Sequence, residues 1–485
     1  MTPTVDLRLV VPAAAAWAGA AAACGWSLSA DRCLALAALA GVLLSVGLRR
    51  FAVAAVAVGV LLGCMSAMVH LAIAQSGPVA AAAKAHAHGV ASVTLVRDPR
   101  PGQKAHGPPY VLADATITSW DGRAAHAAVL VISHGSGWSD LLPGQRLRVR
   151  GRLEPARGGD GLSGVLLATG RPTLIGHPPW WQRIAGLVRV RFRQACRWLP
   201  ADERGLVPGL VVGDVSAMPV ALTAAFRVSG LTHLNAVSGE NCAIVLATVG
   251  ALLRRTPLPR GWRHVVAAAA LAAFVVLARP SPSVLRAAVM GGAALAAGAA
   301  GRRTHPLPLL AGAVLLLVLV DPFLARDPGF ALSVLATASI VLWARPLADQ
   351  LARWMPRGLA VAVAVPAVAQ LACTPVLVAV FGQLSPLAIP ANLLAAPAVA
   401  PATVIGVVVA VIATVALPLA SLLAWVAAVP AGWLALVARS MAGLPGANAR
   451  PSVPLLIGAI AASGVVYASR RRSSALRAML GAWRP

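Results

Sequence analysis

The sequence predicts a polytopic α-helical membrane protein of about twelve spans with a small inserted β-barrel domain, and three observations lead to it. Of the 485 residues, 59% are hydrophobic and only 12% are charged, and the mean hydropathy is +0.78. Soluble domains carry roughly 25% charged residues, so this composition excludes an ordinary soluble globular protein. The apolar residues gather in long runs, and one polar stretch at about 78–178 interrupts them.

A helix needs about 20 mostly apolar residues to cross a bilayer, and twelve runs approach or exceed this length. They are 9–29, 32–48, 51–75, 231–252, 264–279, 283–300, 305–320, 329–345, 358–381, 385–413, 417–438 and 453–469. With all twelve in place, the arginine-rich connections fall on one side of the membrane: Arg8, Arg49/Arg50, Arg254/Arg255/Arg260/Arg263, Arg302/Arg303, Arg345/Arg353/Arg357 and Arg470–472. The positive-inside rule then predicts a bacterial cytoplasmic membrane protein with both termini in the cytoplasm and residues 78–178 outside.

The charge balance is strongly basic, with 41 Lys and Arg against 15 Asp and Glu, formally +26. Either anionic lipid head groups near cytoplasmic loops or a polyanionic substrate explains such a balance. The six cysteines form no CxxC pair, and no GxxxxGK[ST] loop occurs. We therefore expect no bound metal, no cofactor and no nucleotide hydrolysis by this chain.

The polar stretch predicts a small β-barrel of the OB type. Short β-prone runs at 91–96, 110–119, 125–133 and 146–153 are separated by Pro, Gly and Asp. The last run alternates strictly, which places Arg146, Arg148, Arg150 and Arg152 on one face about 6.6 Å apart. Such a face is either a ladder for nucleic-acid phosphates or a solvated strand surface. The few aromatic residues favour electrostatic binding over base stacking.

Residues 180–199 predict an amphipathic helix in the membrane interface. Apolar residues recur at spacings of three and four, and the aromatic and basic residues lie around them: Trp180, Trp181, Arg183, Arg189, Arg193 and Arg197. Lipid is the simpler partner for this helix, and contact with DNA is the alternative.

A cluster of polar residues lies inside the predicted span 231–252. The sequence GLTHLNAVSGENCAIV at 230–245 places His233, Asn235, Ser238, Glu240 and Asn241 among apolar residues, with Gly239 as a weak point of the helix. Polar groups at this depth are costly unless they face protein or a water-filled path, so a functional role is expected.

This segment resembles the signature of the ComEC competence family, especially its actinobacterial form. Further stretches follow in the family's order, namely GLVVGD at 209–214, PSVLRA at 282–287, DPFLARDPGFALS at 321–333 and ANLLAAP at 391–397. The resemblance covers most of residues 90–470. It implies a channel that takes up single-stranded DNA during natural transformation, with an OB-like outer domain, an outer DNA receptor and a cytoplasmic helicase or translocase. Many relatives continue into a metallo-β-lactamase-like domain, and no such motif occurs here. We therefore expect no nuclease activity unless a separate polypeptide supplies it or the sequence is a fragment.

The resemblance divides the chain into helices at 1–77, an OB-like domain at 78–178, an interfacial helix and connector at 179–230, a channel domain at 231–470 and a basic tail at 471–485. It also implies that the polar cluster lines or gates the DNA path together with Arg286, and that Gln370, Thr374, Ser385 and Asn392 add neutral donors in later spans. Arg286 either attracts phosphates or forms an ion pair with Glu240 or Asp321, since an unpaired charge there is expensive.

Two other functions remain open at this point. The first is an intramembrane enzyme on a lipid-linked or envelope substrate, with His233 and Glu240 as acid and base on one helix face. The second is a transporter of small anions.

Overall fold

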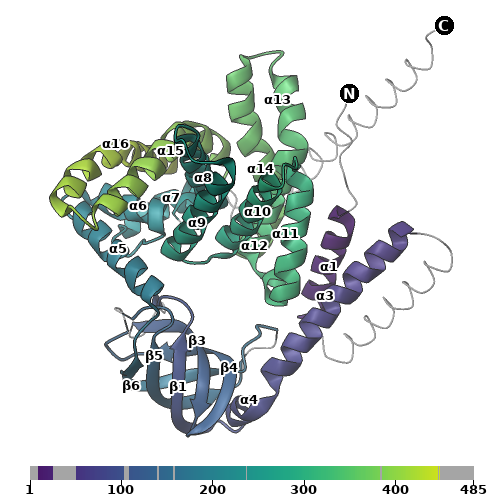
Figure 1. Ribbon diagram of the computed structural model, residues 1–485, viewed down its shortest axis with the longest axis vertical. Coiled ribbons are helices and arrows are strands. Elements are labelled where there is room, and N and C mark those ends of the chain that lie inside the picture. Colours follow the sequence, from purple (N-terminus) through teal and green to yellow (C-terminus); the bar gives the residue numbers. More distant parts are fainter. Residues whose placement is uncertain are drawn as a thin grey trace.

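The computed structural model describes residues 9–25, 51–102, 109–138, 141–156, 159–235, 237–382, 385–445 and 447. A β domain lies at one end of the molecule, and the helices gather at the other (Figure 1). The chain enters the β domain through α3 (Phe51–Gln75) and α4 (Gly77–Lys84), and leaves it through α5 (Trp180–Cys196). The β domain is therefore tied to the helices at both of its ends.

The β domain is a barrel. Its strands are β1 (His88–Leu95), β2 (Arg100–Gly102), β3 (Tyr110–Trp120), β4 (Arg123–Ser133), β5 (Arg146–Glu154) and β6 (Gly164–Gly176). The order β1-β5-β6-β4-β3 closes through a pairing of β1 with β3, and β2 extends β3 at an edge. All of these pairings are antiparallel except that of β4 with β6.

All four predicted strands are confirmed, and β2 and β6 were missed. The sequence of β6 contains Gly170, at positive φ, and Pro172, residues typical of turns. The barrel interior is filled by the inward residues of each strand, including Val93, Ile117 and Leu147. Helix α4 packs against the barrel through Val79 and Ala83, so it covers part of this core.

Each predicted run that the structure describes contains a helix, while the helices Ala201–Val212 and Val220–Val228 were not predicted, and the count of about twelve spans stays a prediction. The remaining helices are α1 (Val10–Ala23), α6 (Ala201–Val212), α7 (Val220–Val228), η1 (Thr232–Leu234), α8 (Gly239–Arg254), α9 (Arg260–Ala278), α10 (Pro282–Ala299), α11 (Pro306–Val320), η2 (Pro322–Arg326), α12 (Pro328–Ser339), η3 (Ile340–Ala344), α13 (Arg345–Leu351), α14 (Arg357–Phe381), α15 (Ala388–Ile412) and α16 (Leu417–Ala442). Among the described residues, seven helices are long and apolar enough to cross a membrane, and α1 and α11 are shorter apolar helices. The predicted spans 32–48 and 453–469 lie outside the described residues.

Small residues let these helices approach closely. A Cβ at Gly63 of α3 would lie 2.1 Å from the carbonyl oxygen of Ala16 in α1, so only glycine fits there. Buried alanines follow one face of α16 in the same way, where it packs on α15 and α6. Close contact between small residues is the usual basis of helix association in membranes, because lipid provides no hydrophobic drive between helices.

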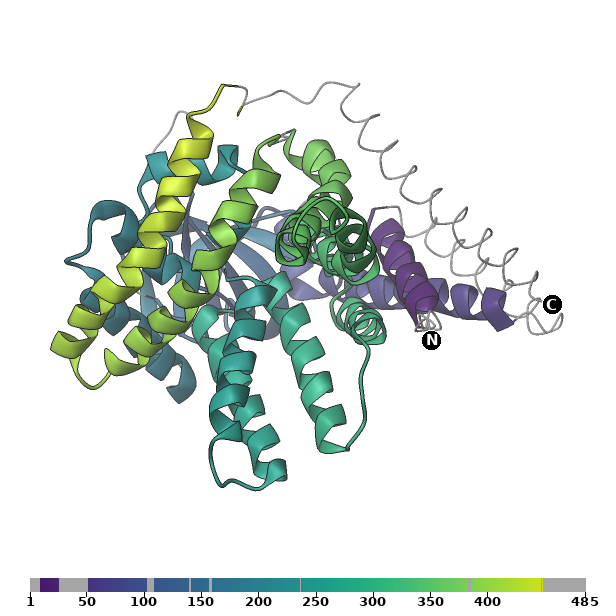
Figure 2. The ribbon, with the colours of Figure 1, turned by 90° about the horizontal axis from the view of Figure 1, so that it is seen from above.

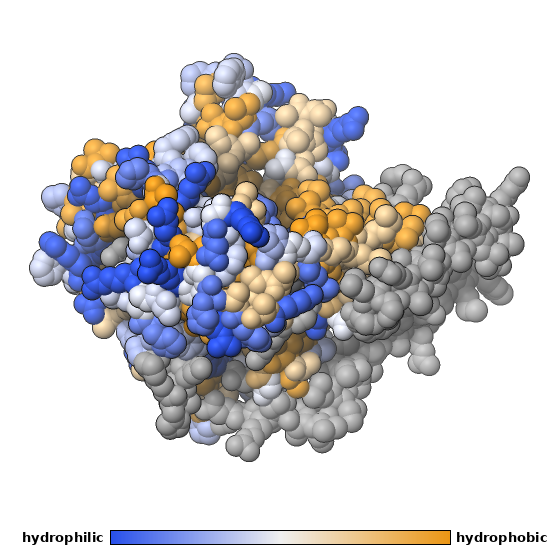
Figure 3. Space-filling view, turned by 90° about the horizontal axis from the view of Figure 1, so that it is seen from below, coloured by the Kyte–Doolittle hydropathy of each residue, from blue (hydrophilic) through white to orange (hydrophobic). Residues whose placement is uncertain are grey.

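Two helix groups flank a central one. Figure 2 shows α15 and α16 on one side, α1 and α3 on the other, and α12 and α14 between them. The largest core cluster joins α5, α6, α7, α15 and α16, so the amphipathic helix that leaves the barrel is packed into the helical part. From below, where the β domain faces the viewer, hydrophilic residues gather over much of the surface (Figure 3).

Candidate functional site

The polar cluster of 233–241 lies at a break before a helix, not inside one. Helix α8 begins only at Gly239, after the short 3-10 turn Thr232–Leu234. The prediction of a continuous span over 231–252 is therefore wrong at its amino-terminal end. Gly230 adopts a left-handed φ of 75°, and the Ser238 side chain caps α8, so local backbone chemistry ends one element and begins the next.

Hydrogen bonds hold this break against two neighbouring elements. The Ser238 hydroxyl accepts from the Asn241 backbone N–H at 3.4 Å, and the Asn241 side-chain amide donates to the Leu210 carbonyl at 2.8 Å. The Gly239 N–H donates to the Ser283 hydroxyl of α10 at 3.2 Å. The start of α8 is thus anchored to α6 and α10 by polar contacts.

Arg286 lies beside this anchored helix end and has no carboxylate partner among the described residues. It is 6% exposed; its Nε donates to the Ser333 hydroxyl at 3.0 Å and its Nη1 contacts the Met290 sulfur at 3.3 Å. A Cβ built on Gly239 would lie 3.0 Å from Arg286 Nη2, so the guanidinium borders the amino terminus of α8.

The alternative of an ion pair between Arg286 and Glu240 or Asp321 is wrong for the described residues. Glu240 is exposed and forms no ion pair within the described ranges. Asp321 instead accepts from the Phe323 N–H, which caps the following turn. Within the described ranges, the buried guanidinium of Arg286 is therefore held by neutral hydrogen-bond partners and not by an acid.

The other predicted path residues divide between surface and interior. His233 is exposed, while Asn235 is half-buried and its Oδ1 has no hydrogen-bond partner among the described residues. The side chain of Asn392 donates to its own helix at Ala388, and Gln370 has its carbonyl bonded by Thr374. No hydrogen bond in the described part of the chain joins Gln370 or Asn392 to the break before α8.

One further contact bears on the predicted site. Ser385 donates to the Val228 carbonyl at 2.7 Å, which brings the start of α15 next to Gly230.

His233 and Glu240 do not share a helix, because the helix starts at Gly239. The premise of the intramembrane-enzyme hypothesis, that these two residues lie on one helix face, is therefore wrong. Among the described residues, no group of three His, Cys, Asp or Glu is placed to hold a metal ion.

The arginine ladder on β5 has the predicted alternation. Arg146, Arg148 and Arg150 are exposed, and Leu147 and Val149 between them are buried in the barrel. Their cross-strand neighbours on β1 are Thr94, Ser92 and Val90, and those on β6 include Gly176, Thr173 and Thr169. Arg152 differs, because its guanidinium pairs with Glu154 at 2.8 Å. Three arginines of the ladder are thus free of ion pairs within the described structure.

Helix α5 presents apolar and basic residues outward as an interfacial helix requires. Trp180 is 67% exposed, and Trp181, Ile184 and Leu187 are exposed as well. Arg183 and Arg197 are also exposed, and Arg197 stacks on the Trp198 ring. These side chains are placed where lipid or another partner can reach them.

Arg189 was predicted to be an interfacial residue, and the structure buries it instead, at 13% exposure. Its Nη1 donates to the backbone carbonyls of Val212 and Leu277, and its Nη2 faces the carboxylates of Asp98 at 3.7 Å and Asp214 at 4.0 Å. Burial lowers the pKa of Arg189, and the two carboxylates act in the opposite direction. The helix therefore turns one arginine inward.

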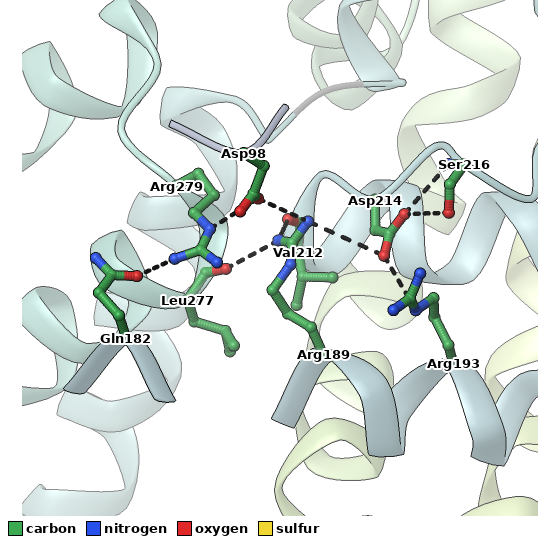
Figure 4. Close-up of polar contacts among 9 residues, drawn as sticks. All are labelled: Asp98, Gln182, Arg189, Arg193, Val212, Asp214, Ser216, Leu277 and Arg279. Carbon is green, nitrogen blue, oxygen red and sulfur yellow. Dashed lines mark hydrogen bonds and ion pairs between the residues drawn. The ribbon is translucent and has the colours of Figure 1, made fainter. Parts of the chain in front are cut away.

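Five charged residues meet at this point, and we call them the interdomain cluster: Asp98, Arg189, Arg193, Asp214 and Arg279 (Figure 4). Arg279 Nε donates to Asp98 Oδ2 at 2.9 Å, and its Nη1 donates to Gln182 of α5. Arg193 Nε lies 3.5 Å from Asp214. Asp98 comes from the loop after β1, and Arg279 from the connection between α9 and α10, so the cluster joins the barrel to the helices.

The interdomain cluster adjoins the break before α8. A Cβ at Gly213 would contact Val237 at 3.4 Å and the Ala278 carbonyl at 3.5 Å, and these are neighbours of Asp214, Ser238 and Arg279 in sequence. Of the cluster, only Arg189 and Arg193 were predicted as site residues. The motif at 209–214 contained a signal for Asp214, while Asp98 and Arg279 had none.

The comparisons with known proteins agree with the helical part of this arrangement. The model of the family described as "Competence protein" matches residues 210–472, which is more than half of the chain. The chain belongs to the competence protein family. The family match begins within α6, beside the interdomain cluster, and includes the break before α8 and Arg286.

Two curated members of the competence family are similar to this chain. ComE operon protein 3 of Bacillus subtilis (strain 168) is 29% identical over 199 residues, which are 41% of this chain and 25% of that protein. Competence protein ComA of Neisseria gonorrhoeae is 26% identical over 224 residues, covering 38% of this chain and 32% of that protein. The matches thus span about a quarter and a third of these relatives. No solved structure matches the chain.

Proposed function

We propose that this chain forms the membrane channel through which single-stranded DNA enters the cytoplasm during natural transformation. DNA carries one charge per nucleotide, so its path through a bilayer must offer water, polar groups and a modest positive field. The names of the two relatives refer to competence, and membership of the competence family supports the same process for this chain.

The observation that carries the proposal is Arg286. Its guanidinium is buried beside the amino terminus of α8 with no carboxylate partner in the described part of the chain, and it combines a full positive charge with the positive end of a helix dipole. Two positive groups in contact are unfavourable unless an anion visits them, and a passing phosphate is such an anion. Glu240 and His233, which belong to the same segment as this helix start, are exposed. We propose that His233, Asn235, Ser238, Glu240, Asn241 and Arg286 line the path, with Gln370 and Asn392 farther along it.

We further propose that the barrel is an OB-like domain that receives DNA. Its five closing strands have the pairing pattern of that fold, with a β1-β3-β4 meander, a parallel pairing of β4 with β6, and closure of β1 on β5. The free arginines Arg146, Arg148 and Arg150 suit sequence-independent contact with phosphates. In this proposal Arg152 contributes less, because Glu154 already pairs with it.

The proposed topology has about twelve spans in the bacterial cytoplasmic membrane, both termini in the cytoplasm, and the barrel outside. Helix α5 then lies in the outer interface with Trp180, Trp181 and Arg183 toward lipid. An outer DNA receptor would deliver the strand, a cytoplasmic helicase or translocase would pull it, and any strand degradation would come from a separate nuclease.

Uptake of labelled DNA by a strain carrying altered alleles at the native locus tests the proposal. We expect Arg286→Ala and Glu240→Ala each to reduce transformation to the level of a deletion strain while the protein still inserts in the membrane. Gly312→Ala is the matched control, because an added Cβ there meets nothing within 4 Å. Wild-type transformation in both path variants at normal protein level would contradict the proposal. Loss of small-anion flux without any effect on DNA entry would favour a transporter instead.

A further inference from the structure

The interdomain cluster holds more positive charge than its own acids neutralise. Three guanidiniums, those of Arg189, Arg193 and Arg279, face two carboxylates. Arg189 and Arg279 are each 13% exposed, so water screens them poorly. Guanidiniums in such a setting bind an oxyanion, whether a carboxylate or a phosphate.

The two carboxylates are held very differently. Asp214 uses both oxygens, since Oδ1 accepts from the Ser216 hydroxyl at 2.6 Å and backbone N–H at 3.2 Å, while Oδ2 faces Arg189 and Arg193. Asp98 uses only Oδ2, toward Arg279 and Arg189, and its side chain is 33% exposed. Within the described structure, no backbone hydrogen bond holds residues 97–99. Asp98 is therefore the carboxylate that can leave, by rotation of a side chain on a short loop.

Arg279 occupies a backbone position that favours glycine, so its side chain must be the reason for an arginine there. Its backbone has φ 67° and ψ 139°, a conformation that strains any residue with a Cβ and that glycine would adopt freely. Its Nη2 is buried and has no hydrogen-bond partner among the described residues. The guanidinium is thus positioned at a cost in strain and still has a donor to offer.

We infer that Arg189 and Arg279 form a binding site for a phosphodiester of the nucleic-acid backbone, which the Asp98 carboxylate occupies when DNA is absent. This inference rests on the proposed function. A carboxylate and a phosphodiester each carry one negative charge, so the exchange leaves the charge of the site unchanged. The two free oxygens of a phosphodiester can accept from both guanidiniums at once, including the unfilled Nη2, and arginine favours such forked contacts.

The position of the site fits a step between barrel and channel. Asp98 belongs to the barrel, and its two arginine partners belong to the helices (Figure 4). Arg189 lies in α5, and Arg279 lies in the connection that leads into α10, the helix of Arg286. Val237, at the break before α8, packs in one core cluster with Ala278, the neighbour of Arg279 in sequence. A strand that displaces Asp98 would release the barrel loop from the helices at the same moment, so DNA binding and separation of the two parts are coupled.

Binding of a fluorescein-labelled oligothymidine to the full chain in neutral phosphatidylcholine nanodiscs tests this inference. Removal of an internal competitor should tighten binding, and we expect Asp98→Asn to lower the Kd about tenfold, equivalent to about 1.4 kcal/mol. Arg279→Gln should weaken binding and make the logarithmic salt dependence less steep by about 0.7, the loss of one phosphate contact on a single strand. In the double variant the gain from Asp98→Asn should vanish.

The control is Asp114→Asn, which removes the same charge from the barrel and frees Arg100, its partner at 3.1 Å. An equal gain in this control would reduce the effect to bulk charge and overturn the inference. Asp98→Glu keeps the competing carboxylate and should bind the oligothymidine as tightly as the wild type does. This variant tests the inference even if the other variants fail to fold. If the wild type binds DNA and Asp98→Asn binds no better, occupancy by Asp98 is overturned and the proposed function survives. If the wild type binds no DNA at all, both fail.

A lipid head group carries the same phosphate chemistry and is distinguished by a second series of nanodiscs. Addition of phosphatidylglycerol should leave the gain of Asp98→Asn in place if the site takes DNA. If anionic lipid abolishes the gain, the phosphate that the site accepts belongs to the membrane, and the inference is overturned.

Discussion

Arg286→Met separates the two possible reasons for a buried arginine, stability and function. The change removes the charge and keeps an apolar side chain of similar reach next to Met290, which already contacts the guanidinium. The hydrogen bond from Arg286 to Ser333 at 3.0 Å is lost. The hydroxyl of Ser333 donates to Ser283 at 3.1 Å, and Ser283 accepts from the Gly239 N–H, so the anchor of α8 persists without the guanidinium.

The change in the free energy of unfolding expected for Arg286→Met follows from two opposing contributions. An arginine at membrane depth costs about 2.5–3.5 kcal/mol on insertion scales. Its hydrogen bond to a neutral hydroxyl returns about 1.5 kcal/mol, and the sulfur contact adds little. We therefore expect Arg286→Met to raise the free energy of unfolding by about 1 kcal/mol while transformation is lost. If Arg286 served only stability, Arg286→Met would lower the free energy of unfolding.

Two measurements on the same variant check this expectation. Unfolding of the purified chain in detergent, followed by tryptophan fluorescence, reports stability, and transformation frequency at equal protein level reports function. Ser333→Ala is the control, because it removes a hydroxyl and keeps the charge; it should lower stability by about 1 kcal/mol and leave transformation measurable. A loss of more than about 2 kcal/mol in Arg286→Met would refute the reasoning, because it would mean that the surrounding protein fully compensates the charge.

Two further predictions concern the barrel and the interdomain cluster. Arg279→Gly should be more stable than Arg279→Ala by about 1 kcal/mol in thermal unfolding, because glycine relieves the strained φ of 67°; equal stabilities would show that the backbone is not strained. Arg150→Gln should make the logarithmic salt dependence of oligonucleotide binding less steep by about 0.7, while Arg152→Gln should change it less, since Glu154 already neutralises that arginine; identical slopes would remove the ladder from the DNA path.

Local periodicity was sufficient for most elements. Apolar runs located α9, α10, α14, α15 and α16 within a few residues, because length and composition alone make a helix soluble in lipid. The strict alternation in β5 located the arginine ladder, because a strand places successive side chains on opposite faces. Strand β6 was missed because Gly170 and Pro172 interrupt its pattern, and its pairing with β4 and β5 is what makes it a strand.

The candidate site was predicted only in part. Its residue types were found, since polar groups in an apolar run are conspicuous, but the assumed helix through them was wrong. The hydrogen bonds that fix the break reach Leu210 and Ser283, 31 and 44 residues away in the chain, and no local pattern contains them. For the same reason the acidic partner predicted for Arg286 was wrong, because Ser333 became available only through the packing of α12 on α10.

The sequence by itself determined that this is a membrane protein, that it contains a barrel with a basic strand, and that it has a polar segment among its spans. These properties depend on the solvent preference and alternation of neighbouring residues, which the chain carries with it wherever it folds. Only the tertiary structure decided which charges meet. Asp98 and Arg279 are 181 residues apart, and they form an ion pair because the barrel and the helices are joined by α5, which brings the two loops to the same point.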